Sequence, residues 1–141
     1  MDYMVDFIEA KYHLAVAERM IEGYREYPEK RFLVGVINEG AKAVSRIIRA
    51  FFVYYGISGG NLDKFLMEVA PKHFDSVTSE NLMKMLEVEK AQKISPIEFI
   101  KGDKIILLIH GKYRVLTASR IVEFIKSAGV AISKFPTGIK R

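Results

Sequence analysis

Hydrophobic residues recur along the first part of the chain with the spacing of an α-helix. Seven apolar positions from Tyr3 to Tyr24 follow one another at alternating intervals of four and three residues, so they share one helix face. Charged residues such as Asp6 and Glu18 lie between them and are expected on a solvated face. Pro28 ends the run, because proline lacks an amide hydrogen and clashes with the preceding turn. The pattern predicts a helix over about residues 2–27.

The next helical pattern, over about residues 31–56, is apolar on two sides. One stripe runs from Leu33 to Tyr54, and a second apolar edge lies beside it. A helix that is apolar on two sides is buried on two sides, which predicts the central element of a bundle, antiparallel to the first helix across a short turn. Four small residues are expected to let these two helix axes approach closely: Ala10, Ala17, Gly40 and Ala43.

The rest of the chain predicts three more helices and a hairpin. Capping residues and apolar stripes indicate helices over about 61–70, 78–93 and 118–135, the last continuous through Gly129. The segment Ser95-Pro96-Ile97-Glu98 has the capping signature of a short helical turn. Two β-rich runs around Gly111 indicate a hairpin near residues 104–117. We therefore expect one mainly all-α domain over residues 1–141, an antiparallel up-and-down bundle of four or five helices with a small β-hairpin insert.

Composition narrows the class of protein. Half of the 141 residues are hydrophobic, which excludes intrinsic disorder. The absence of cysteine excludes disulfides, thiolate metal sites and a cysteine nucleophile, and a cytoplasmic location is the simplest expectation. The acidic N-terminus does not have the pattern of a signal peptide. No apolar run approaches the roughly 20 residues that span a bilayer, so no membrane partner is expected.

Charge is distributed unevenly along the sequence. Residues 1–100 carry a net charge of −2, whereas residues 101–141 carry +7. Two explanations remain open for the basic segment: a polyanionic partner, or a solvated face that keeps the protein soluble.

Motifs for catalysis are missing from the sequence. The three histidines are not at metal-ligand spacing, and no phosphate-binding loop or nucleophile elbow is present. We therefore predict no catalytic residue, no metal and no cofactor, although His110 at the hairpin tip is kept as a candidate for residual catalysis. Candidates for binding phosphate or nucleic acid are Arg46 and Arg49, which share a helix face, and Lys112, Arg114 and Arg120 in the basic segment. Structural ion pairing is the alternative for Arg46 and Arg49.

Several stretches resemble the HEPN domain family. They are His13-Leu14-Ala15-Val16-Ala17, Asn38-Glu39-Gly40-Ala41-Lys42-Ala43 and residues 51–56. The tail is similar to uncharacterised archaeal members of the family in three stretches: Ser95-Pro96-Ile97-Glu98-Phe99, Gly102-Asp103-Lys104 and Tyr113-Arg114-Val115-Leu116-Thr117. The resemblance implies a helical bundle, often a homodimer, encoded with a minimal nucleotidyltransferase in a toxin–antitoxin-like system. Catalytic members of that family carry an Arg followed four to six residues later by a His, and this sequence does not have that motif.

Two hypotheses follow for the function. The first is a non-catalytic HEPN-like binding or assembly module, dimeric, with a nucleotidyltransferase as a partner. The alternative is a protein that binds RNA or a nucleotide through the basic C-terminal segment. Weak ribonuclease activity belongs to this alternative.

Overall fold

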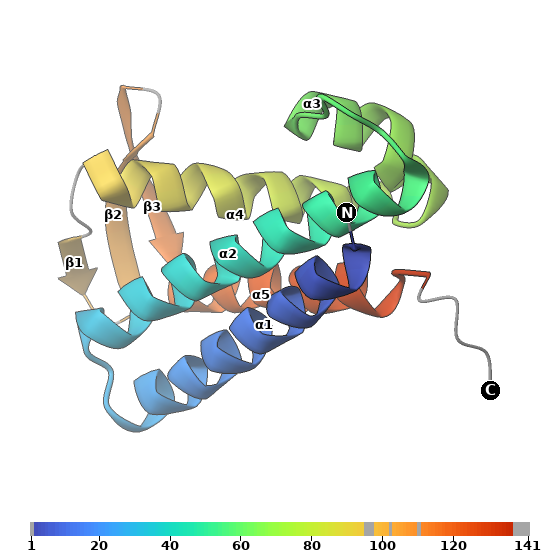
Figure 1. The fold of residues 1–141 in the computed structure, drawn as a ribbon. Helices are drawn as coiled ribbons and strands as arrows, with labels where there is room; N and C mark the ends of the chain where they lie inside the picture. The colour runs from blue at the N-terminus through green and yellow to red at the C-terminus, as the bar shows by residue number, and fades with distance from the viewer. Residues whose placement is uncertain (1, 95–97, 102, 110, 137–141) are drawn as a thin grey trace.

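The chain folds as a helical bundle with a small antiparallel sheet at one end (Figure 1). The computed structural model describes residues 2–94, 98–101, 103–109 and 111–136. Within these ranges there are five α-helices and three strands: α1 (Tyr3–Glu26), α2 (Lys30–Tyr55), α3 (Leu62–Lys64), α4 (Ser76–Ile94), α5 (Ala118–Ser133), β1 (Glu98–Lys101), β2 (Lys104–Ile109) and β3 (Lys112–Thr117). The predicted all-α bundle with a β-hairpin insert is confirmed.

Helix α2 is the central element, as its two apolar sides predicted. It packs against α1 on one side and against α4 and α5 on others, and it crosses the middle of the molecule in Figure 1. Nearly half of its residues are buried, among them Ile37, Val44 and Phe51. It ends at Gly56, which has the left-handed conformation (φ 68°) of a helix C-cap.

The small residues of α1 and α2 do not all serve the contact between these two helices. Ala10 and Ala17 are fully buried. Gly40, however, faces the other way: a Cβ atom there would lie 2.4 Å from Ile125 Cδ1 and 2.9 Å from Met85 Sδ. Gly40 therefore permits the approach of α2 to α4 and α5, and its expected role against α1 was wrong.

The segment after α2 is less regular than the predicted helix over 61–70. Asn61 caps α3 by accepting from the Lys64 amide at 2.9 Å. The chain then widens into a π-helical turn, η1 (Phe65–Val69), and tightens into a 3₁₀ turn, η2 (Ala70–Lys72), which contains Pro71. The first and last residues of the π turn, Phe65 and Val69, are both buried in the core, as the same four-residue spacing would also place them in an α-helix.

The sheet has the strand order β1-β2-β3 and is antiparallel throughout. The predicted hairpin is formed by β2 and β3, and Ile105 and Leu107 of β2 are buried where this strand packs against α4. The predicted helical turn at residues 95–98 was wrong at its described end, because Glu98 starts strand β1 and pairs with Ile106; residues 95–97 lie outside the described ranges. A third strand satisfies one edge of a hairpin that would be marginal alone.

Candidate functional site

A surface groove of about 580 Å³ follows the solvent-facing side of α2. Helix α1 and helix α4 form its two walls, and α2 forms its floor. Polar and charged side chains dominate its lining, which consists of His13, Ala41, Lys42, Ser45, Arg46, Arg49, Glu89 and Lys93. The four α2 positions 42, 45, 46 and 49 lie three or four residues from one another, so they form one polar stripe along the middle of a helix whose other faces are largely buried.

Asp6 of α1 anchors both arginines of this stripe. Its Oδ1 atom lies 3.2 Å from Arg46 Nη1, and its Oδ2 atom lies 3.4 Å from Arg49 Nε. Glu9, one helical turn further along α1, also contacts Arg46 Nη1 at 3.3 Å. The two guanidinium groups are thereby held side by side above one carboxylate.

Asp6 is itself an unexpected core residue. The sequence placed it on the solvated face of α1, but only 4% of its surface is exposed. A buried carboxylate is stable only when it is paired and hydrogen-bonded, and Arg46 and Arg49 provide that pairing. The structural ion pairing considered for these two arginines is therefore present.

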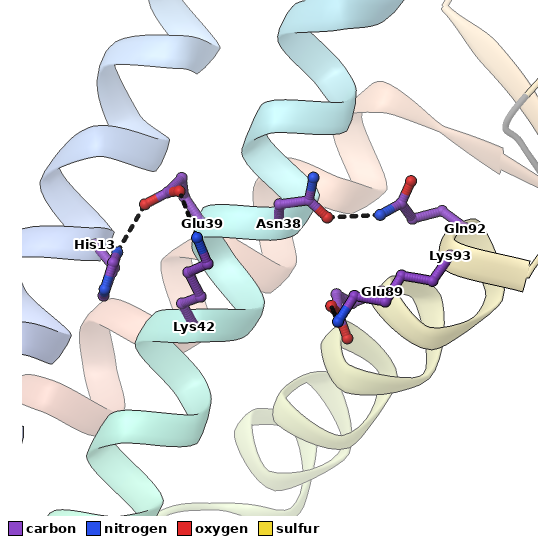
Figure 2. A network of polar contacts seen from close by, with 7 residues as sticks. All are labelled: His13, Asn38, Glu39, Lys42, Glu89, Gln92 and Lys93. Atoms are coloured by element: carbon purple, nitrogen blue, oxygen red, sulfur yellow. Dashed lines mark hydrogen bonds and ion pairs between the residues drawn. The ribbon is translucent and has the colours of Figure 1, made fainter.

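A second ion network extends the groove along α2. His13 Nδ1 of α1 donates to Glu39 Oε1 at 2.7 Å, and Lys42 Nζ lies 3.4 Å from Glu39 Oε2 (Figure 2). Partial burial raises the pKa of Glu39, but the hydrogen bonds from His13 and Lys42 and their charges outweigh it, so the pKa lies below the usual carboxyl value.

The opposite wall of the groove comes from α4. Lys93 Nζ lies 2.6 Å from Glu89 Oε2 within that helix. Gln92 donates to Asn38 Oδ1 at 2.6 Å and so links α4 to α2 (Figure 2). Asn38, a polar residue on the central helix, therefore has a role in holding the two helices together.

In nearly every ion pair of the groove the cation is the more exposed partner. The side chain of Asp6 is 6% exposed, against 39% for Arg46 and 54% for Arg49. Glu39 is 18% exposed and Lys42 58%; Glu89 is 16% exposed and Lys93 67%. The exceptions are Glu9, which at 43% is comparable with Arg46, and the His13–Glu39 pair, at 19% and 18%. Solvent in the groove therefore meets mainly guanidinium and ammonium groups, with the carboxylates beneath them.

The structure separates the two groups of predicted binding residues. Arg46 and Arg49 share the groove, whereas Lys112 and Arg114 lie on β3. Arg120 is on α5, where it pairs with Glu123 at 2.7 Å and stacks over the Phe124 ring at 4.9 Å. His110, the candidate for residual catalysis, lies outside the described residues.

Residues of the groove that the sequence did not single out are Asp6, Lys42 and Lys93. The available signal was the polar stripe on α2, since a helix that is apolar on two sides has only one strip left for charged residues. Lys42 falls on that stripe. Asp6 carried no such signal, because its partners are 40 and 43 residues away in the sequence.

Another polar contact lies near the C-terminal end of α2. The ring nitrogen Nε2 of His73 lies 2.7 Å from the Tyr55 hydroxyl, and Lys72 lies over the Tyr55 ring. Desolvation, together with the positive charge of Lys72, lowers the pKa of His73 below its ordinary value. Among the described residues, no group of three or more His, Cys, Asp or Glu side chains is arranged to hold a metal ion.

No helix in the described part of the chain is both long and apolar enough to cross a membrane. Comparison with protein-family models, with curated proteins and with solved structures finds no match to the chain.

Proposed function

We propose that this protein is a non-catalytic helical binding module whose α2 groove holds the phosphate groups of a nucleotide or of RNA. One observation carries the proposal: the groove presents cations to solvent over carboxylates that are more deeply buried. Phosphate oxygens accept hydrogen bonds from guanidinium groups in paired, planar geometry, and lysines at the groove's rim add point charges.

The arginines have different roles in this proposal. Arg46 is held by Asp6 and Glu9, so it mainly fixes the geometry of the groove. Arg49 uses only its Nε atom for Asp6, and its two terminal nitrogens have no hydrogen-bond partner among the described residues. Arg49 is therefore the residue that directly contacts a phosphate, with Lys42 about two turns earlier on the same face of α2.

A fluorescence anisotropy titration with a labelled ten-nucleotide oligouridylate, and with ADP as competitor, tests this proposal. The double variant Arg49→Gln/Lys42→Gln removes two groove charges. The matched control Lys104→Gln/Lys126→Gln removes two exposed charges outside the groove. We expect at least a tenfold loss of RNA affinity for the groove variant and less than a twofold loss for the control.

The salt dependence gives a second measurement. Each phosphate contact that is lost reduces the slope of log K against log salt by about 0.7 for a single strand, so the groove variant should have a shallower slope than the wild type. Competition by ADP would favour a nucleotide ligand, and its failure would favour an RNA strand. Equal weakening in both double variants, or no binding of either probe by the wild type, would overturn the proposal.

A second candidate function is self-assembly, which the HEPN resemblance implied. The observation that favours it is an apolar stripe on the outer face of α1, formed by Val5, Ile8 and Tyr12, each more than half exposed. Exposed apolar stripes of this kind are typical of contact surfaces. Light scattering should give the mass of two chains for the wild type and of one chain for Ile8→Glu. The control Val77→Glu, which changes an exposed apolar residue of α4, should keep the mass of two chains. A monomeric wild type would exclude this candidate. A nucleotidyltransferase partner stays a prediction of the resemblance alone.

A further inference from the structure

Within the described part of the chain, the outer edge of β3 has main-chain groups that pair with no neighbouring strand. The strand order places β3 at the edge of the sheet. The Ala118 amide donates to the Asp103 carbonyl at 2.9 Å. In an antiparallel pair, residue pairs that exchange hydrogen bonds alternate with pairs that do not, so this bond shows which pairs of β2 and β3 are hydrogen-bonded. In the observed register the residues Leu116, Arg114 and Lys112 exchange hydrogen bonds with β2. The backbone amides and carbonyls of Tyr113 and Val115 therefore point away from β2.

The side chains of β3 differ between the two faces of the sheet. Tyr113 and Val115 are exposed on the outer face, where they lie opposite Leu108 and Ile106 of β2. Lys112 and Arg114 occupy the alternate positions, on the face that carries the buried residue Leu107. An additional strand would thus meet apolar side chains on one face and positive charge on the other.

A hollow of about 290 Å³ lies beside β3, between this strand and helices α4 and α5. Five of its eight lining residues are apolar: Val88, Ile109, Val115, Leu116 and Phe124. The other three are charged: two cations, Lys84 and Arg114, and one carboxylate, that of Glu87. A strand added along β3 would place one inward-facing side chain into this hollow.

We propose that β3 binds an extended, acidic segment of a partner protein by adding it as a fourth strand of the sheet. The open amides and carbonyls of Tyr113 and Val115 form the main-chain hydrogen bonds. One inward apolar side chain fills the hollow, and carboxylates two residues to either side of it pair with Lys84 and Arg114. The outward side chains of the segment pack against Tyr113 and Val115.

Charge selects this occupant over a second copy of the chain. Antiparallel pairing of β3 with itself would bring Lys112 and Arg114 next to the same residues of the other copy, and like charges across neighbouring strands are destabilising. Basic residues on edge strands oppose such self-pairing. An RNA strand would use the positive charges but would leave the open main-chain groups and the apolar outer face without partners.

A labelled peptide with the sequence Gly-Glu-Val-Leu-Val-Glu-Gly tests the proposal by fluorescence anisotropy, with Gly-Lys-Val-Leu-Val-Lys-Gly as the charge-reversed control. Val115→Pro removes an outward backbone amide hydrogen but no hydrogen bond of the ladder to β2. Val115→Thr is the matched control, because it keeps this amide hydrogen and changes the side chain to one of similar shape. We expect the acidic peptide to bind the wild type at least tenfold more tightly than the basic one. Val115→Pro should lose at least tenfold in affinity, and Val115→Thr less than twofold.

A second variant keeps the test independent of how well Val115→Pro folds. Lys84→Glu/Arg114→Glu should reverse the preference, so that the basic peptide binds more tightly than the acidic one. The groove variant Arg49→Gln/Lys42→Gln should bind the acidic peptide like the wild type, which separates this site from the α2 groove. Equal binding of the two peptides by the wild type would overturn the proposal, and so would equal losses of peptide affinity in Val115→Pro and Val115→Thr. It would also be overturned if Lys84→Glu/Arg114→Glu lost oligouridylate binding and kept its preference for the acidic peptide.

Discussion

Asp6 is the residue whose replacement tests the groove most directly. Asp6→Asn keeps the shape of the side chain and removes its charge, which leaves Arg46 and Arg49 without their shared carboxylate. Two unit charges 4 Å apart attract by about 4 kcal/mol at an effective dielectric constant near 20. Much of this attraction is offset, because the buried carboxylate has lost hydration and both arginines are partly solvated. We expect a net loss of about 1–3 kcal/mol in the free energy of unfolding, between the values for exposed and for buried pairs.

Urea denaturation followed by far-UV circular dichroism measures this loss. Glu18→Gln, at an exposed position of the same helix, is the control and should stay within about 0.5 kcal/mol of the wild type. A double-mutant cycle with Arg46→Met should give a coupling energy above about 0.5 kcal/mol, because the two residues are in contact. Salt should weaken the coupling only in part, since Asp6 is buried.

Three results would refute the role given to Asp6. The first is an Asp6→Asn variant as stable as Glu18→Gln. The second is a cycle with Arg46→Met that is additive within about 0.3 kcal/mol. The third is an Asp6→Leu variant that is more stable than the wild type. That result would mean that burying the carboxylate lowers the free energy of unfolding, and that Asp6 does not anchor the groove.

Further predictions concern the core, one histidine and one helix cap. Gly40→Ala should destabilise the protein by about 1–2 kcal/mol, because the new methyl group would overlap Ile125. Gly129→Ala should stabilise it by about 0.5–1 kcal/mol, because the new methyl group meets only an ordinary contact and alanine favours the helix. Urea denaturation measures both changes. The lowered pKa of His73 means that the unfolded chain binds its proton more readily, so the melting temperature should fall as the pH drops from about 6.5 through the folded-state pKa, and less so in His73→Gln. Thr117→Ala, which removes the cap of α5, should cost about 0.5–2 kcal/mol in the same denaturation assay; no change would mean that the first turn of α5 is held by other contacts.

The helices that the sequence predicted well are those whose periodicity is long and regular. For α1 and α2 the repeat runs over more than five turns, and the observed bounds, Tyr3–Glu26 and Lys30–Tyr55, differ from the predicted ones by a single residue at each end. Such a repeat leaves little freedom, because any other conformation would expose the whole stripe. The hairpin was also predicted, since Gly111 with its positive φ of 76° supplies the turn between two β-rich runs.

Features that depend on tertiary neighbours were beyond the sequence. The π turn at Phe65–Val69 could not be predicted, because its buried residues Phe65 and Val69 have the four-residue spacing that an ordinary α-helix also places on one face. Strand β1 forms only because β2 offers it an edge, whereas the local capping signature around Ser95 indicated a helix. Gly40 was recognised as a close-approach residue, but its partner helices could not be identified before the bundle was assembled.

Net charge was the least reliable guide to the candidate site. The basic segment 101–141 carries a net charge of +7, yet all the residues that line the groove lie within residues 1–100, whose net charge is −2. A sum over the sequence counts Asp6 and Arg49 equally, although one carboxylate is buried and the guanidinium is half exposed. A ligand responds to the field at the surface, where the less buried partner of each pair dominates. A near-neutral segment can therefore present a cationic groove, provided that its carboxylates are the groups that fold inward, as Asp6, Glu39 and Glu89 do here.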